Sequence, residues 1–189
     1  CGLKSEHRYR RSEGREYMSM IANRVMTTQH MEDSQTETKR LIDKLRSQER
    51  QEALGAVFAL RQRGLLTDGS MKMAYLARAS LEDAPLEGAD LAGVVLWEAD
   101  LVGTNLAGAN LAGAFLLDAD LSVAVLKGAN LEGAILCGAD LEYADLRWTE
   151  LSGARLDRAL LPDQSLWSPR TDMGRFTDPS HPDFWDPTL

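Results

Sequence analysis

Residues 86–116 read LEGADLAGVVLWEADLVGTNLAGANLAGAFL, and a leucine stands at every fifth position of this stretch. The same spacing continues without a break from Leu76 to Leu166, through 19 consecutive positions. An alanine stands two residues before the leucine in 15 of these 19 pentads, and a glycine often stands two residues after it. A period of five fits neither the 3.6-residue turn of an α-helix nor the two-residue alternation of a strand. It suits a solenoid in which each short side points one large and one small side chain inward and then turns.

This pattern resembles the pentapeptide-repeat family, whose motif reads roughly Ala-(Asp/Asn)-Leu-x-x. Three closely matching stretches are Gly88–Leu91, Gly108–Leu111 and Gly138–Leu141. The resemblance implies an all-β solenoid, a right-handed quadrilateral β-helix with four pentads per coil. In that fold the central leucine points inward and the preceding alanine fills the corner. Nineteen pentads then predict about 4.75 coils.

Charge and composition divide the chain near residue 70. Residues 1–70 carry 13 basic and 10 acidic side chains, whereas residues 76–166 carry 5 basic and 15 acidic ones. The net charge of −8 disfavours direct nucleic-acid binding, because phosphates would be repelled. The predicted segments are a polar, disordered leader (1–33), a helical hairpin cap (34–64), the pentapeptide-repeat β-helix (71–166) and an irregular C-terminal cap rich in aromatic residues and proline (167–189).

Caps are expected at both ends because the terminal coils would otherwise expose core and unpaired backbone groups. Ser34–Arg46 begins with a capping-box pattern, Ser47–Arg63 begins with a serine, and both carry apolar residues at helical spacing. The second of these helices is expected either to cover the first coil or to lie along one face of the stack. Downstream, aromatic residues such as Trp167 and Phe176 are expected to plug the last coil.

One outward face of the predicted coils is apolar. Sorting the outward positions with four pentads per coil gives a stripe three coils tall, here called the apolar stripe: Val95, Trp97, Phe115, Leu117, Ile135 and Cys137. Contiguous apolar patches on soluble proteins usually mark a surface that something covers. The sequence leaves three covers open: the protein's own helices, a second copy of the chain, or a different protein.

A second face stacks three carboxylates, Asp100, Asp120 and Asp140, at intervals of about 5 Å. This acidic ladder could imitate the phosphates of DNA, as the resemblance to quinolone-resistance members of the family implies. The simpler interpretation is that the motif uses Asp before its central leucine. No metal site is predicted, because an open, flat face lacks the convergent ligands that hard cations require.

Residues suited to catalysis are scarce. The three histidines, His7, His30 and His181, lie outside the repeat, and neither a cysteine pair at metal-binding spacing nor a phosphate-binding glycine motif is present. We therefore predict no catalytic residues, no cofactor and no metal. The favoured function is a non-catalytic scaffold or interaction module that binds a protein partner or a second copy. The alternative is a DNA mimic that inhibits a type II topoisomerase (gyrase).

The sequence also bears on location. No apolar run approaches the roughly 18 residues that a membrane-spanning helix needs. We expect a cytoplasmic protein, and the alternative is a lipid anchor on Cys1.

The inward position of the central leucines can be tested at Leu116. We expect Leu116→Lys to unfold the middle coils, because it would bury an unpaired charge among leucines. Thermal unfolding measured by circular dichroism would show the loss. A melting temperature within a few degrees of the wild type would contradict the inward assignment.

Overall fold

The structure is a computed structural model that describes residues 32–188. The chain divides into two compact units, Cys1–Lys39 and Arg40–Leu189. Of the first unit, residues 32–39 are described, and they are helical. Nearly all of the leader predicted over residues 1–33, with the disorder expected there, lies outside the described residues.

Helices open the second unit. Residues 40–45 are helical, and after a short break α2 spans Arg50–Gln62. The sequence pattern suggests Ser47 as the N-cap of this helix, but Glu49 is the N-cap, and Ser47 Oγ accepts a hydrogen bond from the Glu49 backbone N–H at 3.1 Å. Ser34 does not start its helix either, because the described residues before it are already helical.

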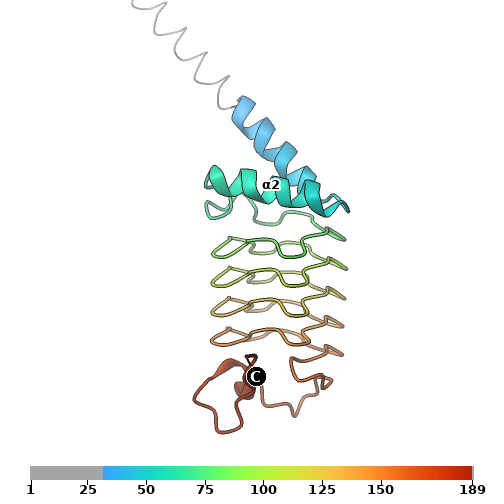
Figure 1. The fold of residues 1–189 in the computed structure, drawn as a ribbon, viewed down its shortest axis with the longest axis vertical. Coiled ribbons are helices and arrows are strands. Elements are labelled where there is room, and N and C mark those ends of the chain that lie inside the picture. Colours follow the sequence, from blue (N-terminus) through green and yellow to red (C-terminus); the bar gives the residue numbers. More distant parts are fainter. Residues whose placement is uncertain (1–31, 189) are drawn as a thin grey trace, which may run out of the picture. The chain divides into compact units, whose positions relative to one another are not determined.

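α2 lies across the first coil of the stack (Figure 1). Its buried face follows the spacing of an amphipathic helix and consists of Ala53, Ala56, Val57 and Leu60. Two arginines hold its two ends: Arg50 pairs with Asp83 at 2.5 Å, and Arg61 pairs with Glu87 at 2.6 Å. Of the two positions expected for this helix, the structure therefore has the one that covers the first coil.

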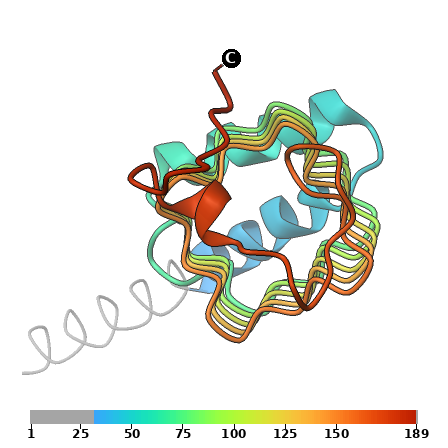
Figure 2. The same ribbon diagram turned by 90° about the horizontal axis from the view of Figure 1, so that it is seen from below.

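The rest of the second unit is a stack of coils in which paired residues lie 20 positions apart. All 14 parallel bridges of the described residues have this spacing, for example Tyr75 with Val95 and Val95 with Phe115. The Leu76 N–H donates to the Val95 carbonyl at 2.7 Å, and the Val95 N–H donates to the Ala74 carbonyl at 2.9 Å. The bridges form four stacks, one on each side of the coil, and the view along the stack shows the closed outline (Figure 2).

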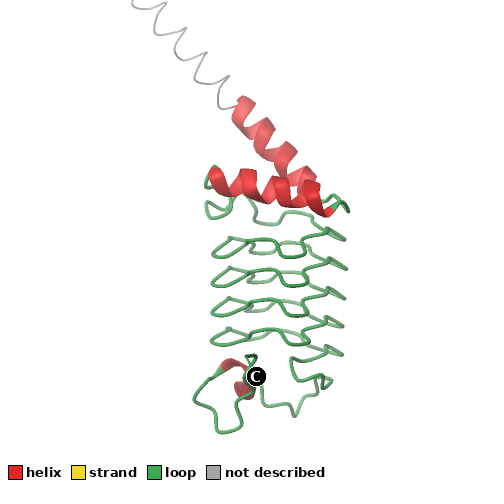
Figure 3. Cartoon of the chain, viewed as in Figure 1, coloured by secondary structure: helices red, strands yellow, loops and turns green. Residues whose placement is uncertain are grey.

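The sides of the coils are too short to be extended strands. Each side contributes one bridged residue before the chain turns, so the coils of the described residues are drawn as loops in Figure 3. The predicted all-β solenoid therefore exists as a ladder of isolated parallel bridges. This differs from a sheet of named strands because the five-residue period leaves no room for a longer pairing.

Leucine and alanine fill the interior of the coils. Every central leucine from Leu76 to Leu146 has 2% or less of its surface exposed. Two corner positions hold threonine in place of alanine, Thr104 and Thr149, and both are buried. The Thr104 hydroxyl donates to the Leu81 carbonyl at 2.7 Å, and Thr149 makes the equivalent bond to the Leu126 carbonyl two and a quarter coils further along. These hydrogen bonds explain how a polar side chain is accepted in the corner.

The ladder of parallel bridges ends at Leu160. The last parallel bridge joins Asp140 to Leu160, and Leu160 then forms an antiparallel bridge with Leu166. Leu166 is 68% exposed, so the prediction that it points inward is wrong. Gln164 stands where a corner alanine belongs, and its amide reaches outward to the Tyr143 hydroxyl. A side chain of that size would overpack the corner, so the pattern breaks there.

The C-terminal segment packs against this end of the stack. It includes α3, Gly174–Thr177, whose Phe176 is 2% exposed and belongs to the core. Trp185 packs beside Phe176 with their ring centroids 6.3 Å apart. The Trp148 N–H donates to the Thr177 carbonyl at 2.6 Å and ties the segment to the last coils. Figure 2 shows the segment lying over the end of the stack.

Each turn between sides passes through a residue with positive φ, two places after the central leucine. Glycine occupies this place in many turns, as at Gly108 with φ 64°, because it has no Cβ to clash. Val123 occupies it with φ 52° and is half exposed. A left-handed conformation costs an L-residue about 1–2 kcal/mol, and a β-branched side chain suits it least.

We therefore expect Val123→Gly to raise the free energy of unfolding by about 0.5 kcal/mol, because relief of strain outweighs the entropy that glycine loses on folding. Chemical denaturation measures the change. Val102→Gly is the matched control, since Val102 lies on the same side without positive φ, and it should lower stability by about 0.5–1 kcal/mol. A loss of stability in both variants would contradict the strain at Val123.

Candidate interaction surface

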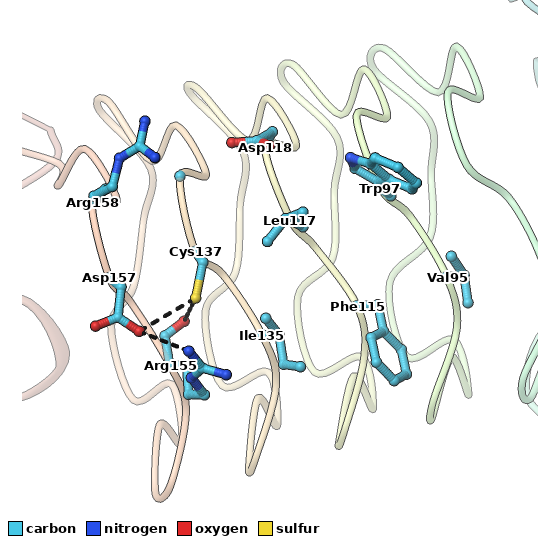
Figure 4. A pocket seen from close by; sticks show the side chains of 11 residues that line it. Val95, Trp97, Phe115, Leu117, Asp118, Ile135, Cys137, Arg155, Asp157 and Arg158 are labelled. Atoms are coloured by element: carbon cyan, nitrogen blue, oxygen red, sulfur yellow. Dashed lines mark hydrogen bonds and ion pairs between the residues drawn. The ribbon is translucent and has the colours of Figure 1, made fainter.

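The apolar stripe occupies one side of three successive coils (Figure 4). Val95, Phe115 and Ile135 are joined in turn by parallel bridges, so they stand directly above one another. The other row follows two residues later on each coil and consists of Trp97, Leu117 and Cys137. The outward positions of one side thus make two parallel rows of apolar side chains.

All six residues of the stripe line one groove of about 710 Å³. Trp97 and Phe115 each keep 43% of their surface exposed, and the other four are half buried. All residues that line this groove belong to the coils, and α2 lies across the first coil instead. Self-cover by the predicted second helix is therefore ruled out.

Charged residues border the C-terminal end of the groove. The Arg155 guanidinium pairs with Asp157 at 3.3 Å, and Cys137 Sγ lies 3.5 Å from the same carboxylate. Arg158 and Asp118 also line the groove, and among the described residues neither has an ion pair. The 20-residue period shows on which side of the coil Arg158 and Asp118 stand. It does not show whether either residue forms an ion pair.

The N-terminal end of the same side is closed by paired groups. The Arg46 guanidinium lies over the Tyr75 ring, 5.3 Å from its centroid. Arg78 pairs with Glu98 at 2.7 Å, and this carboxylate raises the pKa of the Arg78 guanidinium. The two ends of the groove therefore differ, because the C-terminal end has an arginine without an ion pair to any described residue.

The acidic ladder has a local structural role. The Asp100 carboxylate accepts a hydrogen bond from the Val102 N–H at 3.2 Å, and Asp140 accepts one from the Glu142 N–H at 2.8 Å. Asp120 accepts two, from the N–H and the hydroxyl of Ser122. Asparagines at the same motif position do the same elsewhere in the stack. The motif therefore needs a short side-chain acceptor before its leucine, to hold the turn that follows.

The one histidine among the described residues has a partner for each ring nitrogen. His181 lies in the C-terminal segment, where Nε2 pairs with Asp172 at 3.1 Å and Nδ1 accepts from the Asp183 N–H at 3.1 Å. In the described residues, no group of His, Cys, Asp and Glu is placed to hold a metal ion. Nor is any described helix both long enough and apolar enough to cross a membrane.

Comparison with known proteins defines the class. The family model for pentapeptide repeats matches residues 70–107, 89–128 and 119–158. Alr5209, a pentapeptide repeat protein from Nostoc PCC 7120, is 34% identical over 63% of this chain and 88% of its own, with a TM-score of 0.31. The chain belongs to the pentapeptide-repeat family, whose members form right-handed quadrilateral β-helices.

Two further solved structures are similar to parts of the chain. The pentapeptide repeat protein Rfr23 from the cyanobacterium Cyanothece 51142 is 37% identical over 50% of this chain, with a TM-score of 0.47. This chain spans 65% of the length of Rfr23. QnrB1, a plasmid-mediated fluoroquinolone resistance protein, is 21% identical over 36% of this chain and 42% of its own, with a TM-score of 0.30. A search of curated proteins found no match.

The structural role of the ladder can be separated from its charge at Asp120. Asp120→Asn keeps an acceptor for the Ser122 N–H, so it should change the free energy of unfolding by less than about 0.5 kcal/mol. Asp120→Ala removes the acceptor and should cost about 1 kcal/mol. Chemical denaturation of the two variants gives the comparison. Equal effects of both variants would mean that the hydrogen bonds of Asp120 do not stabilise the turn.

Proposed function

We propose that this protein is a non-catalytic protein-interaction scaffold and that the apolar stripe is its binding surface. The observation that carries the proposal is the exposure of Trp97 and Phe115 in an open groove lined by four further apolar residues. A soluble protein rarely leaves such a set of side chains facing water without a use. In this proposal the coils hold the surface, and the segments 34–64 and 167–189 act as caps.

The coils suit this role because they are already ordered before binding. Each row of the stripe is fixed by backbone hydrogen bonds between coils, as from the Phe115 N–H to the Val94 carbonyl at 2.9 Å. A partner therefore meets a surface that loses little conformational freedom, which is a main cost of association. Burying the exposed parts of Trp97 and Phe115 would contribute about 4 kcal/mol before such costs.

The DNA-mimic alternative has weaker support. Its basis is the acidic ladder, and the carboxylates of that ladder already serve the turns that follow them. The neighbouring positions on the same side include Val102 and Ser122, so the acidic surface is not continuous. A local structural need therefore accounts for these aspartates without a gyrase partner. The proposal also assigns the scaffold to the cytoplasm, a reducing compartment that suits the free Cys137.

The proposal is tested by affinity capture from a lysate of the organism that encodes the protein, with three baits. Phe115→Glu places a charge in the centre of the groove and should remove the partner. Val123→Glu adds the same charge at an exposed apolar residue on another side, so it should keep the partner.

A protein retained by the wild type and by Val123→Glu, but lost from Phe115→Glu, is the expected result. Circular dichroism of both variants confirms that each is folded. If all three baits retain the same proteins, or none retains any, the apolar stripe is not the binding surface.

A further inference from the structure

We propose that the apolar stripe binds one amphipathic α-helix of a partner protein, with an acidic side chain at the C-terminal end of that helix placed against Arg158. This inference rests on the proposed function and adds the kind of partner. Three features of the groove support this proposal: the area of its apolar surface, the spacing of its coils and the charges at its C-terminal end.

The stripe is too small for a stable dimer of folded domains. The first and third coils of the stripe lie about 10 Å apart, and the two rows of side chains, which are two residues apart on each coil, lie about 7 Å apart. With side chains included, the apolar surface is on the order of 300 Å², against about 800 Å² per partner in a standard interface. An occupant that needs only this area is a single segment, and two copies of the chain would need contacts well beyond it.

The spacing of the coils matches the rise of an α-helix that lies along the stack. Successive coils are about 4.8 Å apart, and a helix advances about 4.5 Å in three residues and about 6 Å in four. Side chains at i, i+3, i+4 and i+7 therefore lie over the three coils of the stripe, over about 10.5 Å. The groove between the rows of Phe115 and Leu117 receives them, because both rows flank it along its length.

The charges at the border select the direction of the helix. Of the two arginines there, Arg155 already pairs with Asp157, whereas Arg158 has no ion pair among the described residues. Arg158 stands one coil beyond Gly138, in the same column as Asp118, so its guanidinium lies level with the turn after the last apolar side chain, near i+11. An acidic residue at that place completes the pair. The negative end of the helix dipole, which is the C-terminal end, favours the same direction.

Asp118 is the other unpaired charge of the groove. Its carboxylate lies over Gly138, where an added Cβ would collide with Oδ1. It therefore stands on the flank of the groove rather than on its floor. Arg158 lies on the same flank two coils further along, so a helix that complements both charges presents a basic side chain at the level of Asp118 and an acidic one at the level of Arg158.

The probe is a synthetic helical peptide of about 18 residues, long enough to form several turns. It carries leucine at i, i+3, i+4 and i+7, lysine on one flank and glutamate at i+11, and a second peptide has lysine at i+11 instead. Fluorescence anisotropy measures the Kd of each peptide for the full chain and its variants. The variants are Arg158→Glu, Phe115→Glu and, as a charge-matched control away from the groove, Arg170→Glu.

We expect the glutamate peptide to bind the wild type and Arg170→Glu about fivefold more tightly than Arg158→Glu, and the lysine peptide to show the reverse order. Both peptides should lose binding to Phe115→Glu. If each peptide binds the wild type and Arg158→Glu equally well, the proposed contact of an acidic side chain with Arg158 is wrong. If Phe115→Glu still abolishes peptide binding in that case, the proposed function stands. Binding that survives Phe115→Glu would overturn both.

A second measurement identifies the occupant directly. A photo-crosslinking phenylalanine analogue replaces Phe115 in the full chain, and mass spectrometry maps the products. The expected product links the peptide to this position when peptide is present. A crosslink to residues 1–31 or to a second copy, unchanged by added peptide, would overturn the partner helix and assign the groove to that occupant. If neither peptide binds the wild type, the partner helix is also overturned. The lysate capture then still tests the proposed function.

Discussion

The pairing of each bridged residue with the residue 20 positions further along is the constraint on which the rest of this structure depends. The hydrogen bonds between coils are satisfied only if every coil has the same length, as in the donation from the Leu96 N–H to the Phe115 carbonyl at 2.8 Å. Equal coils stack their leucines over leucines and their alanines over alanines. They also stack their outward positions into columns, so the surface chemistry is set column by column. The groove exists because two neighbouring columns are apolar over three coils.

The five-residue period was sufficient to predict the interior. Inward leucines and small corner residues follow from packing alone, and packing depends on side-chain size, which the sequence states directly. Sorting the outward residues into sides succeeded for the same reason, because a constant coil length converts sequence position into place. All six residues expected in the stripe line one groove.

The sequence could not predict features that depend on tertiary choice. The sequence left two positions open for α2, and the ion pairs of Arg50 and Arg61 with the first coil become visible only in three dimensions. Leu166 fits the period but is exposed, because the chain reverses to pair with Leu160. Arg155 pairs with Asp157, whereas Arg158 has no ion pair within residues 32–188, and both facts depend on side-chain direction, which a column assignment does not specify.

The constant coil length also limits how the gene of such a protein can change. An insertion of one residue within the coils would move every later leucine out of register. An insertion of five residues, one whole pentad, would keep the leucines in the core. A pentad, however, turns all following columns by one side, so Phe115 and Ile135 would no longer share a column if the insertion fell between them. Only the gain or loss of four pentads together keeps both the interior and the surface pattern. The heritable unit of length in this solenoid is therefore the coil rather than the pentad.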